Sequence, residues 1–104
     1  MPEFVAERYL SAADAASAAR DVRSARSAAD QLARDGTPVR FVRSIFIPAD
    51  ETCIYVFEAE SIEAVRAVAA RASLHVERIS EAISQPQTHN KADASMQARA
   101  ESRP

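Results

Sequence analysis

The chain has 104 residues, 47% of them hydrophobic, and a formal net charge of −2 at pH 7. Its single glycine and single cysteine exclude a glycine-rich phosphate loop, a multi-cysteine zinc site and an internal disulfide. We expect no membrane span, because no stretch approaches the roughly 20 apolar residues required, and no nucleic-acid partner, because basic residues alternate with acidic ones. The first ten residues lack the basic and apolar regions of a secretory signal, so we expect a cytoplasmic protein.

The first half of the chain predicts a strand and then a long helix. Residues 2–9 alternate in polarity and are β-biased. Ser11 has the character of a helix N-cap, and residues 12–34 are rich in alanine and other helix formers. Gly36, followed by Pro38, is expected to end this helix, because glycine tolerates a left-handed backbone and proline cannot continue a helix.

The second half predicts a hairpin, a second helix and a last strand. Pro48 begins a four-residue sequence suited to a type I turn between two apolar strands. Ser61 is expected to cap the second helix, whose apolar residues recur at helical spacing. The expected elements are a strand at 39–47, a turn at 48–51, a strand at 52–59, a helix at 62–72 and a strand at 75–83.

These elements follow the order βαββαβ, and the two halves of the chain repeat one pattern. That order predicts an α+β fold of the ferredoxin-like class, with a four-stranded antiparallel sheet and both helices on one face. We place this domain at residues 1–84. Residues 85–104 contain no aromatic residue and no Val, Ile or Leu, so we expect a polar, disordered C-terminal tail.

One layer of helices leaves the other face of the predicted sheet open. The hairpin strands carry large apolar residues at both alternations, and we expect Phe46, Tyr55 and Phe57 to lie on the open face. Because exposed apolar patches mark interfaces, the pattern predicts a homodimer that packs sheet against sheet, as a dimeric α/β-barrel-like assembly with a shared interior. The alternative is that the tail or the long first helix covers part of this face.

Two residues of the domain have side chains suited to nucleophilic or metal chemistry. We interpret Cys53, the only thiol, as a small buried strand residue, because its strand is not adjacent to the one expected to begin at His75. His75 is the only histidine of the domain and is either an exposed residue beside a loop or a metal ligand. For a metal site, a dimer could supply two copies of His75 together with carboxylates such as Glu77 or Glu51.

Charged residues on or near the strands offer a second kind of site. They form either a salt-bridged sheet surface or the polar lining of a dimer cavity that holds an anion or a small metabolite. For the second interpretation, the candidate ligand-binding residues are Arg43, Tyr55 and Glu77. No set of residues has the spacing of a catalytic centre, so we expect no catalytic residues.

Three segments of the chain are similar to a known family. They are MPEFVAERYL, GTPVRFVRSIFIPADETC and FEAESIEAVRAVAARASL, and the most specific motif is P-x-D-E-T-C followed by F-E-A. The chain resembles a small actinobacterial domain-of-unknown-function family that includes a Streptomyces ferredoxin-like nickel-binding protein. The resemblance covers about residues 2–83 and implies a dimeric ferredoxin-like fold and nickel binding.

The chain departs from this family in its histidines. Members similar to the nickel-binding protein have more histidines near the first strand, where this chain has Arg8 and Tyr9. His75 is therefore the one position to which the resemblance carries over a metal ligand.

Together these observations predict a homodimeric protein that binds a small ligand or a metal ion, for which nickel or another divalent metal is a candidate, and that has no evident catalytic motif. Two alternatives come from other functional classes. One is a small-molecule enzyme that uses a cavity at the dimer interface, and the other is a structural or interaction module.

Overall fold

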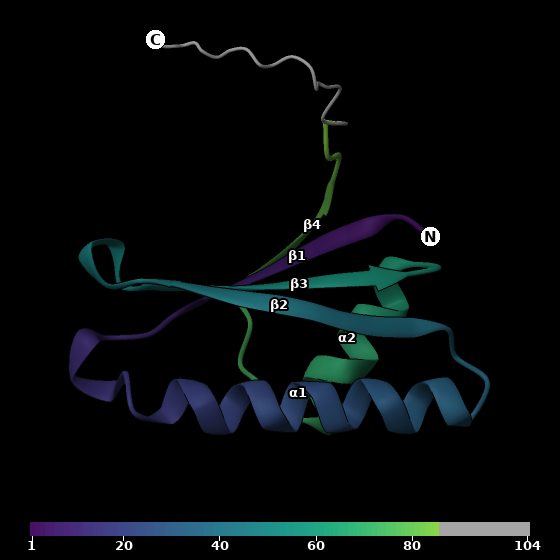
Figure 1. The fold of residues 1–104 in the computed structure, drawn as a ribbon, viewed down its shortest axis with the longest axis horizontal. Helices are drawn as coiled ribbons and strands as arrows, with labels where there is room; N and C mark the ends of the chain where they lie inside the picture. Colours follow the sequence, from purple (N-terminus) through teal and green to yellow (C-terminus); the bar gives the residue numbers. More distant parts are fainter. Residues whose placement is uncertain (86–104) are drawn as a thin grey trace, which may run out of the picture.

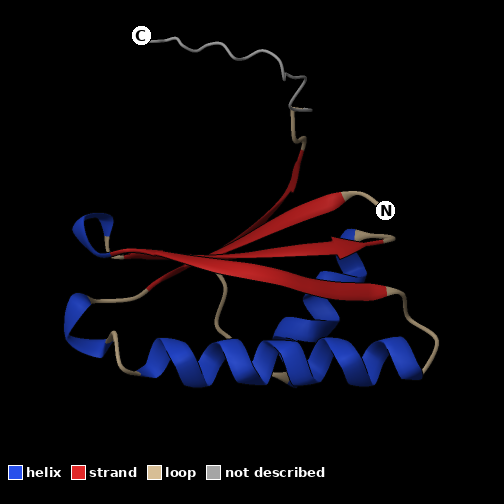
Figure 2. Cartoon of the chain, in the orientation of Figure 1, coloured by secondary structure: helices blue, strands red, loops and turns tan. Residues whose placement is uncertain are grey.

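The computed structural model describes residues 1–85, which form one sheet and one layer of helices (Figure 1). The elements are β1 (Glu3–Tyr9), η1 (Ala12–Asp14), α1 (Ser17–Arg34), β2 (Val39–Ile47), η2 (Pro48–Asp50), β3 (Thr52–Ala59), α2 (Ile62–Arg71) and β4 (Arg78–Ala82). The strands pair antiparallel in the order β2-β3-β1-β4, and both α-helices lie on one face (Figure 2). This arrangement confirms the expected ferredoxin-like fold.

Two further expectations concern the C-terminal tail and the absence of a membrane span. The predicted tail lies outside the described residues, apart from Gln85. Within the described part, no helix combines the length and the apolar character that crossing a membrane requires.

Helix α1 ends where the sequence predicts but begins later. Gly36 has a φ of 99°, and its N–H donates to the carbonyl of Ala33 while the N–H of Thr37 donates to that of Leu32. These bonds satisfy carbonyls that the helix leaves free at its end. The predicted start is wrong, because Ser11 precedes a separate 3₁₀ turn and its side chain caps no backbone N–H. α1 begins only after that turn.

Helix α2 begins as predicted, whereas β4 is shorter than expected. Oγ of Ser61 accepts a hydrogen bond from a backbone N–H of the first turn at 3.3 Å, so Ser61 is the N-cap. β4 does not include His75, which lies in the loop between α2 and β4. The end of this loop is bonded to the sheet, where the N–H of Glu77 donates to the carbonyl of Glu7 at 2.7 Å.

A β-bulge changes the faces of β2. The register with β3 shifts between Phe41 and Arg43, and the extra residue reverses the face that later side chains take. Phe41 and Phe46 therefore both lie on the helix side, although they are five positions apart. The expectation that Phe46, Tyr55 and Phe57 lie on the open face is wrong, because all three pack against the core beneath the helices.

The core lies between the sheet and the helices. The helices contribute mostly small side chains, namely Ala25, Ala28, Ala29 and Leu32 of α1 and Ala64, Val65, Val68 and Ala69 of α2. This leaves room for the strands' aromatic rings, because a close-packed interior must fill the space that alanines leave. Phe41 and Phe57 meet there edge to face, with ring centroids 5.5 Å apart. The aromatic rings of β3 therefore pack on the helix side of the sheet.

Candidate functional site

The open face of the sheet has an aliphatic centre. Residues opposite each other in antiparallel strands share a face, so the register brings four aliphatic side chains together. We call Val5, Ile45, Ile54 and Val56 the aliphatic patch. Ile45, on the edge strand, is 39% exposed, whereas Val56 is 8% exposed although it lies outside the core under the helices. The open face therefore presents aliphatic surface to solvent, with isoleucine and valine in place of the expected aromatic residues.

Ion pairs lie on both sides of this patch. Arg40 of β2 lies 2.9 Å from Glu58 of β3, and Arg78 of β4 lies 3.0 Å from Glu7 of β1. Both pairs join neighbouring strands on the open face. Such exposed pairs each contribute up to about 1 kcal/mol, so they add little to the stability of the sheet.

The three predicted ligand-binding residues do not share one surface. Arg43 is exposed on the open face of β2, opposite Val56. Glu77 lies just before β4, at the other edge of the sheet, with β3 and β1 between them. Tyr55 lies beneath the helices and is 0% exposed. Its predicted place in a lining of the open face is therefore wrong, because a ligand on that face cannot reach it.

Glu77 has a clear role in holding the backbone. Its Oε1 accepts a hydrogen bond from the N–H of Tyr9 at 3.1 Å, while its own N–H is bonded to Glu7. These two bonds fasten the loop before β4 to the end of β1. His75 lies two positions earlier in the same loop and is exposed.

The donors for a metal ion are scattered in the described part of one chain. Residues 1–85 contain no group of three or more His, Cys, Asp or Glu side chains that could hold a metal. Cys53 is buried in the core, as predicted, and His75 is exposed in a loop. Nickel favours sites that supply several imidazoles. The described residues of a single protomer therefore do not fit a nickel site.

Polar side chains are also buried on the helix side of the sheet. The hydroxyl of Tyr55 has no hydrogen-bond partner within the described residues. Burial raises the pKa of this hydroxyl well above its ordinary value, and the neighbouring Cys53 raises it further. Arg8 and Asp21, which form an ion pair, lie close enough for their charges to act on the same pKa. The raised pKa keeps the tyrosine neutral further into the alkaline range than an exposed tyrosine.

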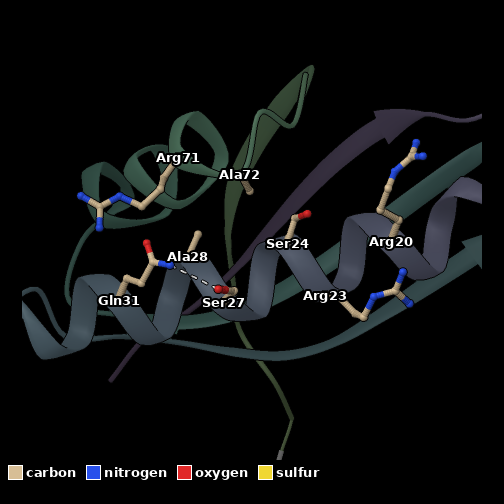
Figure 3. A pocket seen from close by; sticks show the side chains of 8 residues that line it. All are labelled: Arg20, Arg23, Ser24, Ser27, Ala28, Gln31, Arg71 and Ala72. Atoms are coloured by element: carbon tan, nitrogen blue, oxygen red, sulfur yellow. Dashed lines mark hydrogen bonds between the residues drawn. The ribbon is translucent and has the colours of Figure 1, made fainter.

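Sequence reasoning missed a hollow between α1 and α2 (Figure 3). It has a volume of about 350 Å³ and is lined by Arg20, Arg23, Ser24, Ser27, Ala28, Gln31, Arg71 and Ala72. Every polar side chain in this lining carries a hydrogen-bond donor, and none is acidic. The signal in the sequence is the spacing of Arg20, Arg23 and Arg26, which repeats every three positions along one helix.

Comparison with known proteins supports the family resemblance and the fold. Residues 4–82 match the family model described as nickel responsive protein SCO4226-like. The chain is also similar to the crystal structure of SCO4226 from Streptomyces coelicolor A3(2), with 22% identity and a TM-score of 0.56, over 81% of this chain and 99% of that one. No curated protein matches the chain. The structural likeness shows the shared fold, and the family match spans well over half of the sequence. The chain therefore belongs to the family of nickel-responsive, SCO4226-like proteins.

Proposed function

We propose that the protein is a homodimer that binds a small ligand, with a nickel ion as the first candidate. The observation that carries this proposal is the aliphatic patch on a sheet face that no helix of residues 1–85 covers (Figure 1). Burying apolar surface is favourable by roughly 25 cal/mol per Å². A second copy suits the patch, because a two-fold axis brings the same aliphatic side chains against each other.

The charges beside the patch support the same arrangement. Arg43 is exposed next to Val56, and no carboxylate within residues 1–85 lies in ion-pair distance of it. It is therefore available to an acidic group of a second copy or to a bound anion. Glu77, at the other edge, offers the carboxylate oxygen that does not bind Tyr9. Arg43 and Glu77 remain the candidate ligand contacts.

The choice of nickel rests on the family and on one side chain. The family is described as nickel responsive, and His75 is the only histidine among the described residues. Since residues 1–85 of one protomer do not bring enough donors together, the proposed site that uses His75 adds donors from the second copy. The proposed metal site thus depends on the proposed dimer.

The dimer is tested by the oligomeric state of the full chain. Ile45→Lys places a charge in the aliphatic patch at a side chain that is already exposed, so the protomer should still fold. Ala70→Lys adds the same charge on the exposed side of α2. Analytical ultracentrifugation should show dimers for the wild type and for Ala70→Lys, and monomers for Ile45→Lys. A wild-type chain that sediments as a monomer at all concentrations would refute the dimer.

The metal is tested by titrating nickel into the same proteins in a calorimeter. We expect heat of binding in the wild type and its loss in His75→Ala. His89→Ala is the matched control, because it removes the other histidine of the chain. Absence of heat in the wild type would remove nickel from the proposal. Retention of binding in His75→Ala would exclude His75 as a ligand.

A further inference from the structure

The first half of α1 carries a pattern of charges that disfavours a helix. Arg20, Arg23 and Arg26 follow each other at three-residue intervals, so neighbouring guanidinium groups repel each other. The positions four residues after the first two arginines, where an acidic partner would stabilise the helix, hold Ser24 and Ser27. A local arrangement that works against its own element is typical of a functional surface.

Two of these arginines lack the partners that other arginines of the chain have. Ion pairs within 4.0 Å are formed by Arg8, Arg40, Arg66, Arg71 and Arg78. Arg26 lies over the ring of Phe41, 5.1 Å from its centroid. Within residues 1–85, Arg20 and Arg23 have neither kind of partner. Their charge is therefore directed only to solvent and to the hollow that they line.

The hollow itself is positive and elongated. Two small residues, Ala28 of α1 and Ala72 directly after α2, line it and leave its space unfilled. Figure 3 shows Arg20 and Arg23 toward one end of the hollow and Arg71 and Gln31 toward the other, with Ser24 and Ser27 along α1 between them. Arg71 is partly neutralised by Asp35, at 3.5 Å. From Arg20 to Gln31, α1 rises by roughly 16 Å, so the donors form a line rather than a point.

We propose that this hollow binds an oligophosphate chain. The oligophosphate lies along α1, and its most highly charged end contacts Arg20 and Arg23. One guanidinium group can donate two parallel hydrogen bonds to the oxygens of a phosphate. The hydroxyls of Ser24 and Ser27 can donate to further oxygens. A single phosphate would occupy only one end of the line, whereas an oligophosphate offers an acceptor at each step. The described part of the chain holds more acidic than basic residues, so the site is a local feature and does not follow from net charge.

This site does not depend on the proposed dimer. The hollow lies in the helix layer, on the other side of the sheet from the aliphatic patch (Figure 1). Pairing of two open faces would therefore leave the hollow accessible.

The test uses the full chain, free of added metal, with inorganic tripolyphosphate and ATP as probes at about 0.15 M ionic strength. We expect calorimetry to show binding of tripolyphosphate to the wild type. In the double variant Arg20→Gln, Arg23→Gln, the affinity should fall by at least about tenfold. The matched control is Arg34→Gln, Arg66→Gln, which removes the same charge from the helix layer outside the hollow. Its affinity should be unchanged.

Two results would overturn the proposal: no binding of either probe by the wild type, or equal losses of affinity in the two double variants. Circular dichroism of each variant establishes that the helices are intact. If ATP and tripolyphosphate bind equally well, the ligand is the phosphate chain alone. Tighter binding of ATP would identify a nucleotide as the source of that chain.

Discussion

The guanidinium group of Arg8 lies 2.8 Å from the carboxylate of Asp21, and this ion pair joins β1 to α1. The two side chains are only 19% and 15% exposed. Their charges act on the hydroxyl of Tyr55, which is buried nearby without a hydrogen-bond partner within residues 1–85. The helix side of the sheet therefore combines a satisfied polar contact with an unsatisfied one.

Removing the unsatisfied hydroxyl should stabilise the protein. A buried polar atom without a partner costs about 1–3 kcal/mol, so Tyr55→Phe should raise the free energy of unfolding by about 1 kcal/mol in urea denaturation. Tyr9→Phe is the control, because Tyr9 is exposed and its change should stay within about 0.5 kcal/mol. A loss of stability in Tyr55→Phe would mean that the hydroxyl has a partner, such as a buried water molecule.

The same hydroxyl should make the protein less stable in alkaline solution. Burial raises the pKa of Tyr55 in the folded state, whereas a tyrosine in the unfolded chain titrates near about 10. The folded state thus holds the proton more tightly than the unfolded chain does. The resulting contribution to the free energy of unfolding is fully present below pH ~10 and is lost as the pH rises toward the folded-state pKa. In this range the free energy of unfolding should fall by up to about 1.4 kcal/mol per pH unit. Urea unfolding at several pH values should show a shallower decline in Tyr55→Phe, and identical declines would contradict this assignment.

The two serines before the helices should differ in their effect on stability. Ser61 accepts a hydrogen bond from the first turn of α2, so Ser61→Ala should lower the free energy of unfolding by about 1 kcal/mol. Ser11 caps no backbone N–H, and Ser11→Ala should change stability by less than about 0.5 kcal/mol. Thermal and urea unfolding of the two variants give the comparison. Equal losses would show that Ser11 caps its turn in solution.

The repeated arginines of α1 should weaken the free protein. Arg23 has arginines three residues before and three residues after it, and like charges at this spacing cost about 0.2–0.5 kcal/mol for each pair. Arg23→Gln should therefore raise the melting temperature slightly at low ionic strength. The gain should disappear in about 1 M salt, which screens the repulsion. A variant that melts below the wild type at low salt would show that Arg23 is held by a favourable contact.

Local sequence patterns were sufficient for most of the elements. The strands of the hairpin occupy Val39–Ile47 and Thr52–Ala59, as the alternation and the flanking prolines predict. Gly36 ends α1 and Ser61 begins α2, because each acts on the backbone within one turn of its own position. The start of α1 was less accessible, since alanine favours a helix equally well in residues that form a 3₁₀ turn.

The choice of faces could not be read from the hairpin strands. Tyr55 and Val56 are neighbours and both apolar enough to be buried, so alternation alone leaves open which of them the helices cover. Strict alternation also separates Phe41 from Phe46, and the bulge that puts both on one side appears only when β2 pairs with β3. Register is defined only between two paired strands, so the sequence of one strand does not reveal it.

The candidate sites divide in the same way. The sequence by itself determined which residues have chemistry to offer, including His75 as the one histidine of the domain and the arginines spaced along α1. Only the tertiary structure decided that Tyr55 is enclosed, that Arg43 and Glu77 lie at opposite edges, and that the two helices leave a hollow between them. Composition and periodicity act within a few residues, whereas a site depends on distances between segments that come together only when the chain packs.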